Sequence, residues 1–185
     1  MRSETARVAI LQATASQLSE RGWDQLTIEG IAATAGVGKP TIYRWWPSKS
    51  ALIADALLDG ILTPPADLPR DTGDLRADLI AWLEPTLRLG GDADATALTR
   101  YLVAAAAEDE VVGRRLDDAN PATRVLTERL TAAQSTGDLA ASAPVDLIVD
   151  ALLGAFILRV LRRAPSDPGD AALLVDTLLA AHTPR

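Results

Sequence analysis

Residues 27–49 read TIEGIAATAGVGKPTIYRWWPSK, and this stretch decides the fold class. It contains two short helical patterns joined by a turn around Gly36, where a glycine supplies the positive φ that such a turn needs. Thr27 can cap the first helix, and Pro40 is tolerated in the first turn of the second helix. Two helices joined by a short, glycine-containing turn predict a helix-turn-helix.

The second of these helices, residues 39–45, carries hydrogen-bond donors that suit DNA. It is short enough to point its N-terminal end into a major groove. Lysine, tyrosine and threonine side chains donate to phosphate oxygens, and Lys39 or Arg44 can also read the O6 and N7 atoms of guanine. Pro40 and Thr41 offer apolar surface to a thymine methyl group. This chemistry favours DNA as the partner of the element.

The charges of the chain are distributed unevenly, with 18 Lys and Arg against 25 Asp and Glu and a net charge of −7. The first 50 residues carry six basic and four acidic side chains, whereas the remaining residues carry twelve and twenty-one. Both lysines, Lys39 and Lys49, fall within the predicted helix-turn-helix. The asymmetry favours a DNA-binding N-terminal segment. The alternative is a helical protein–protein interaction module without DNA binding, because similar two-helix corners occur there too.

Composition removes most catalytic classes. The chain has no Cys, and its single His is His182, so thiolate chemistry, Ser–His catalysis and Cys- or His-ligated zinc have no support. Acidic residues cluster at 108–110 and 117–118, but such runs are more typical of solvated helix ends than of a metal site. We therefore expect no enzyme, no cofactor and no metal.

Targeting signals are also missing from the sequence. The N-terminus lacks the apolar stretch of a signal peptide, and no uninterrupted apolar run approaches the ~18 residues of a membrane span. We expect a cytoplasmic protein with no membrane partner.

Helical periodicity recurs along the whole chain, and no strand-like alternation is present. The patterns cover residues 4–21, 28–35, 39–45, 48–62, 74–89, 93–107, 110–135, 145–163 and 169–181, with a bend expected at Pro121. The Pro-rich stretch 63–73 is the best domain boundary. The sequence thus predicts an all-α protein with a three-helix DNA-binding domain at 1–47, a linking helix at 48–62 and a larger helical domain at 63–185.

Three tryptophans belong to or flank the helix-turn-helix. We expect Trp23 and Trp46 to pack in the core, since Trp46 lies on the side that faces the first helix. For Trp45, contact with the DNA backbone and packing remain equally open.

The pattern at 145–163 is apolar around almost its whole circumference, so it needs cover on more than one side. A second apolar stripe follows at 169–181. Together they predict a four-helix dimer interface with two helices from each subunit, and an intramolecular core is the alternative. The candidate interface residues are Ile148, Leu152, Phe156, Leu174 and Leu178.

Residues 27–52 resemble the N-terminal domain of TetR-type (tetracycline-repressor-like) transcriptional regulators, and recognisable similarity covers about 5–60. The Ala-Gly-Val turn, the Thr-Ile-Tyr helix and the Pro-Ser-Lys step occur together at the spacing of that family. The resemblance implies an all-helical homodimer of about nine helices that acts as a repressor released by a small-molecule effector. A symmetric dimer places two identical helices on the DNA, so we expect an inverted-repeat operator. In two departures, Gly38 stands where a capping hydroxyl residue is frequent, and Trp46 stands where Phe is usual.

The resemblance also implies site residues. The DNA face would comprise Thr27, Lys39, Pro40, Thr41, Tyr43, Arg44, Trp45 and Lys49, with Thr27 and Lys49 on phosphate. The helices at 74–89, 93–107 and 110–135 would enclose an effector pocket. Its candidate lining residues, chosen from apolar stripes with Arg100 as a counter-charge, are Leu79, Trp82, Leu83, Arg100, Tyr101 and Phe156.

Overall fold

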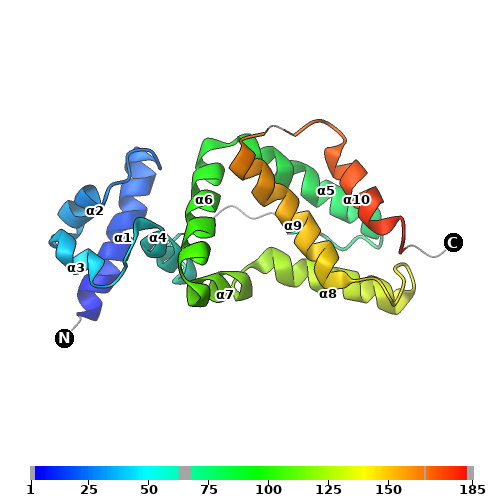
Figure 1. Ribbon diagram of the computed structural model, residues 1–185, viewed down its shortest axis with the longest axis horizontal. Helices are drawn as coiled ribbons and strands as arrows, with labels where there is room; N and C mark the ends of the chain where they lie inside the picture. Colours follow the sequence, from blue (N-terminus) through cyan, green and yellow to red (C-terminus); the bar gives the residue numbers. More distant parts are fainter. Residues whose placement is uncertain (1–2, 63–67, 165, 183–185) are drawn as a thin grey trace. The chain divides into compact units, whose positions relative to one another are not determined.

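The computed structural model describes residues 3–62, 68–164 and 166–182, and these ranges are helical without a strand (Figure 1). The predicted all-α fold is confirmed. The elements are α1 (Glu4–Arg21), α2 (Ile28–Ala35), α3 (Lys39–Tyr43), α4 (Lys49–Leu58), α5 (Leu75–Arg88), the 3-10 turn η1 (Leu89–Gly91), α6 (Ala93–Glu108), α7 (Glu110–Asp118), α8 (Pro121–Thr136), α9 (Val145–Arg162) and α10 (Asp170–Leu179).

The stretch predicted as one bent helix at 110–135 is instead two helices, α7 and α8. The Asn120 side chain accepts a hydrogen bond from the backbone N–H of Ala122 at 3.0 Å and caps α8. Pro121 is then the first residue of α8, where its missing N–H costs nothing. The proline therefore starts a helix rather than bending one. Part of the Pro-rich boundary, residues 63–67, lies outside the described residues.

The described residues form two compact units. Those within 1–65 and 97–119 form the first unit, and those within 66–96 and 120–185 form the second. Because α7 and most of α6 pack with α1–α4, these units differ from the division at 47 and 62 that the sequence suggests. That division remains a prediction about function.

The first unit is built around a small apolar core from α1, α2, α3 and α4. Ile10, Ile31, Ile42 and Leu52 are fully buried there. Trp46 is 4% exposed in the same core, which confirms its predicted packing role, and Trp23 packs partly buried against it. This core fixes the two helices of the helix-turn-helix against α1 and α4.

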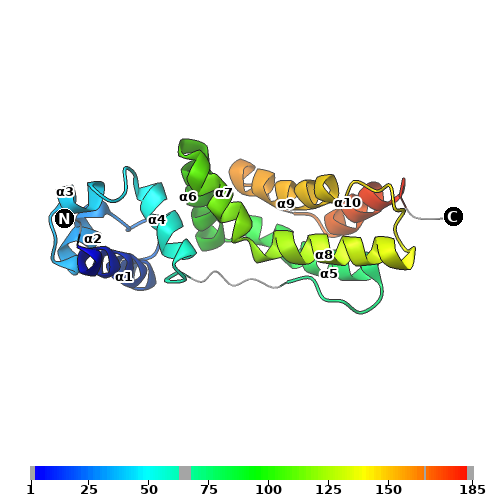
Figure 2. The ribbon, with the colours of Figure 1, turned by 90° about the horizontal axis from the view of Figure 1, so that it is seen from below.

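The second unit packs α5, α8, α9 and α10 side by side, as Figure 2 shows. Leu79, Leu83, Leu126 and Leu130 are almost completely buried between these helices. The cluster continues into α9 through Leu152, which is 0% exposed. Within the described ranges, no helix is both long and apolar enough to cross a membrane.

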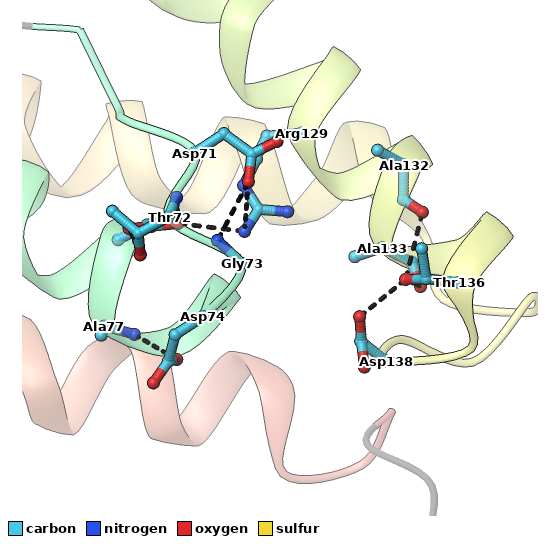
Figure 3. Close-up of polar contacts among 11 residues, drawn as sticks. Asp71, Thr72, Gly73, Asp74, Ala77, Arg129, Ala132, Ala133, Thr136 and Asp138 are labelled. Carbon is cyan, nitrogen blue, oxygen red and sulfur yellow. Dashed lines mark hydrogen bonds and ion pairs between the residues drawn. The ribbon is translucent and has the colours of Figure 1, made fainter.

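A buried ion pair between Asp78 and Arg129 joins α5 to α8. Figure 3 shows Arg129 beside Asp71, which belongs to the segment before α5. Asp78 accepts hydrogen bonds from the backbone N–H and the hydroxyl of Thr72 at 2.9 and 2.6 Å, and from Arg129 at 3.0 Å. Arg129 also lies 3.1 Å from Asp71. The hydrogen bonds from Thr72, followed by the contact with Arg129, lower the pKa of Asp78 below its ordinary value.

Candidate nucleic-acid interface

The turn between α2 and α3 has the geometry of a helix-turn-helix. Thr27 caps α2 by accepting a hydrogen bond from the Gly30 N–H at 3.0 Å. Gly36 adopts φ 66°, the left-handed conformation that favours glycine, and its N–H donates back to α2. Gly38 precedes α3 without a side-chain cap, as its departure from the family pattern predicts.

The exposed face of α3 carries the predicted donors. Lys39, Pro40 and Arg44 are exposed, and Tyr43 is 52% exposed. The opposite side of the helix is held by Ile42, which is 0% exposed in the core of the first unit. One side of α3 is therefore anchored, while the other presents an ammonium, a phenol and a guanidinium to solvent.

Lys39 forms an ion pair with Glu29 in the first turn of α2. The Lys39 Nζ lies 2.8 Å from Glu29 Oε1, and the two side chains are 52% and 66% exposed. The hydrogen bond between them lowers the pKa of Glu29 and raises the pKa of Lys39. Both groups are therefore charged at neutral pH.

Lys49, expected on phosphate, is engaged within the first unit. Its ammonium donates to the Leu26 carbonyl at 3.0 Å and lies 4.8 Å from the centroid of the Tyr101 ring. Tyr101 also stacks on Trp23, with ring centroids 5.7 Å apart. A cation over an aromatic face is attracted to the ring quadrupole, so Lys49 joins α4 to α6.

The remaining predicted DNA-face residues are either partly buried or already hydrogen-bonded within the first unit. Thr41 is half-buried, and Thr27 is exposed while its hydroxyl oxygen serves as the α2 cap. Trp45 is half-buried and packs against the core, with its ring centroid 6.0 Å from that of Trp46. Packing is therefore part of the role of Trp45.

A polar cluster that the sequence did not predict adjoins the end of the helix-turn-helix, whose second helix, α3, is the recognition helix. Asp55 of α4 accepts from the Trp46 indole N–H at 3.0 Å and from Arg7 at 2.6 Å, and Arg115 of α7 lies 3.5 Å away. Arg7 also pairs with Asp59 at 2.7 Å. The hydrogen bonds to Asp59 and Asp55 raise the pKa of Arg7. The cluster thus connects α1, α4, α7 and the end of the helix-turn-helix.

The structure divides the predicted effector residues between the units. Leu79, Trp82 and Leu83 lie in the core of the second unit, and Phe156 packs partly buried against them. Arg100 and Tyr101 belong to the first unit.

Elsewhere in the second unit is a surface hollow of about 560 Å³, which none of the predicted effector residues lines. Its walls include Asp74 and Asp138, which are labelled in Figure 3, and the ion-paired Arg76 and Asp176.

The predicted dimer residues differ in how far they are buried within their own subunit. Ile148 and Leu152 are 3% and 0% exposed inside their own subunit. Phe156, Leu174 and Leu178 are half-buried against the same core. The exposed apolar residues of α9 and α10 are different ones, namely Leu147, Leu158, Leu161 and Leu173.

A short helix that is anchored on one side and carries cationic and hydroxyl donors on the other is typical of helix-turn-helix DNA-binding proteins. The sequence matches the tetR family of bacterial regulatory proteins over residues 10–56. It matches the tetracyclin repressor-like C-terminal domain over residues 69–178. The chain belongs to the TetR family, whose members are transcriptional regulators and not enzymes. The resemblance seen in the sequence is thereby confirmed.

Relatives and solved structures agree with this assignment. An HTH-type transcriptional regulator of Mycobacterium tuberculosis is 32% identical over 179 residues, covering 94% of this chain and 86% of that protein. The DNA-binding transcriptional repressor TetR of Mycobacteroides abscessus is 32% identical over 180 residues, covering 96% and 94%. The crystal structure of the TetR family transcription regulator SCO0332 is similar with a TM-score of 0.63 and 33% identity, covering 97% and 99% of the two chains.

Proposed function

We propose that this regulator is a repressor that binds double-stranded DNA through the exposed face of α3 and leaves it when a small molecule binds. The observation that carries the DNA-binding part is the exposure of Lys39, Tyr43 and Arg44 around the buried anchor Ile42. Lys39 and Arg44 are the candidates for base contact, whereas Tyr43 suits phosphate. Because the proposed partner is double-stranded DNA, we place its action in the cytoplasm.

The test of the DNA face uses sequences enriched from a random DNA pool. Arg44→Ala should lower affinity for the enriched sequence by about 1–3 kcal/mol in fluorescence anisotropy. Arg124→Ala is the matched control, because Arg124 is an exposed, ion-paired arginine of α8. Equal losses of DNA affinity in Arg44→Ala and Arg124→Ala would show that α3 does not read the DNA sequence.

We further propose a homodimer formed by an exposed apolar stripe of α9. Leu147, Leu158 and Leu161 are 65%, 49% and 49% exposed and follow helical spacing along one side. A Cβ added at Gly154 would meet no atom within 4 Å, so this position leaves room for a second helix to approach closely. A symmetric pair of α9 helices would cover the stripe and place two recognition helices on an inverted repeat.

For the effector, we propose the core of the second unit around Leu79, Trp82, Leu83 and Phe156, whose apolar side chains would have to part to admit a molecule and would suit an apolar or aromatic one. A route to the DNA-binding helices exists inside the first unit. Ser48 at the start of α4 donates to Glu108 of α6 at 2.7 Å, and Lys49 lies over Tyr101. A displacement of α6 would therefore disturb the start of α4.

The effector proposal is tested by screening small molecules for release of DNA, then repeating the response with Trp82→Phe and Trp82→Leu. Both variants should keep DNA binding and require more of the molecule for release. An unchanged response in both would place the effector site elsewhere.

A further inference from the structure

The ion pair between Glu29 and Lys39 sits at the DNA face of α3, where a carboxylate is unexpected. A carboxylate repels phosphate, and Glu29 offsets the charge of the first lysine of the recognition helix. The pair contributes little to folding, because both side chains are more than half exposed and exposed pairs are weak. Glu29 also lies in the first turn of α2, where a carboxylate favours the helix dipole, but that local role does not require its contact with Lys39.

The pair does offer a specific chemical pattern. With 2.8 Å between Lys39 Nζ and Glu29 Oε1, a donor and an acceptor stand side by side at the N-terminal end of α3. The N-terminal end of a recognition helix is the part that contacts base edges. In the major groove, a G·C pair presents the O6 and N7 acceptors of guanine beside the N4 donor of cytosine. The two patterns are complementary.

We propose that Glu29 and Lys39 act together as one specificity-determining unit that reads a single G·C base pair in each half-site. The Lys39 ammonium donates to guanine O6 or N7, and the Glu29 carboxylate accepts from cytosine N4. The inference rests on the proposed binding of DNA through α3. It adds a reading residue that belongs to α2 rather than to the recognition helix.

The experiment is selection from a random DNA pool with the full-length wild type, Glu29→Ala, Glu29→Gln and Lys39→Ala. The wild type should require G·C at one position of each half-site. Glu29→Ala and Lys39→Ala should both lose the preference at that same position, with affinity for the wild-type sequence about tenfold lower. Glu29→Gln should move the preference toward A·T, because an amide pairs with adenine N6 and N7.

Glu20→Gln is the control for charge alone. Glu20 is an exposed glutamate of α1, and its substitution removes the same charge at a position away from α3. It should leave the base preference unchanged. Thermal melting of each variant verifies folding, and the exposure of both side chains predicts only small changes in melting temperature, including the small loss expected when Glu29 leaves the first turn of α2.

Two results would overturn the inference. One is a Glu29→Ala variant that keeps every base preference and binds all DNA more tightly, which would mean that Glu29 only repels the phosphate backbone. The other is loss of preference at different positions in the Glu29 and Lys39 variants. If the wild type enriches no sequence at all, the proposed DNA-binding function itself fails.

Discussion

Asp55 is the residue on which the end of the helix-turn-helix depends. Its carboxylate receives the indole N–H of Trp46 and the guanidinium of Arg7, and its side chain is 17% exposed. Removing this acceptor leaves the buried indole N–H without its partner, and such a loss costs about 1–3 kcal/mol. We therefore expect Asp55→Ala to lower the free energy of unfolding by about 2 kcal/mol in urea denaturation.

The cluster around Asp55 also offers a control variant and a double-mutant cycle. Glu4→Ala removes the exposed partner of Arg7 and should change stability by less than about 0.5 kcal/mol. Trp46→Phe keeps the ring packing but deletes the N–H, so the double variant Asp55→Ala/Trp46→Phe should be less destabilised than the two single losses combined. Full additivity would show that the hydrogen bond contributes nothing.

Acid should weaken the second unit through Asp78. Its folded pKa is lowered, so its stabilising contribution is complete above the unfolded value of about 3.9 and is lost as the pH falls through the lower folded value. The wild type should therefore lose more free energy of unfolding than Asp78→Asn between about pH 5 and about pH 2. Asp176→Asn should change the pH profile less, because Arg76 also lowers the pKa of Asp176 but this pair is exposed and screened by solvent. Parallel profiles for the wild type and Asp78→Asn would contradict this.

At the scale of elements, the residues that cap helices and form turns gave the most accurate predictions. The cap at Thr27 and the left-handed Gly36 give α2 its predicted bounds, whereas α4 begins near the predicted residue but ends at Leu58, four residues before the predicted end at 62. Local rules do not determine which distant segments meet. The packing of α6 with the helix-turn-helix depends on the Trp23–Tyr101 stack, and the Glu29–Lys39 pair joins residues ten positions apart across a turn.

The helix α9 illustrates the same limit. Apolar residues surround it, so the sequence indicates that two sides need cover without telling which side faces its own subunit. Burial assigns Ile148 and Leu152 to the intramolecular side. The outer side then carries Leu147 and Leu158, which are exposed.

This division of α9 predicts opposite results for two leucines. Leu158→Glu should give a folded monomer, because Leu158 is 49% exposed and belongs to the proposed dimer stripe. Leu152→Glu should unfold the second unit, because it buries a charge at a fully enclosed site. Sedimentation velocity and circular dichroism separate the two outcomes. A Leu158→Glu variant that remains dimeric would move the interface to another surface.

At the scale of the whole molecule, one subunit contributes one recognition helix, and the proposed dimer contributes two. Two such helices joined by a symmetric interface fit half-sites whose centres lie about 34–36 Å apart on one face of the DNA, or at a longer spacing of whole helical turns. Binding should therefore depend on the helical phase of the two half-sites as well as on their sequence.

Inserting about five base pairs at the centre of the enriched inverted repeat turns one half-site to the opposite face of the duplex. The dimer should then engage only one half-site, and its affinity should fall by more than about tenfold, because the second recognition helix no longer contributes. The monomeric Leu158→Glu variant should bind the original and the expanded sites equally weakly, since it carries a single recognition helix. Anisotropy titrations of both proteins on both DNAs provide the measurement. Equal affinity of the wild type for the two sites would mean that subunits bind independently and that the symmetric dimer does not set the operator.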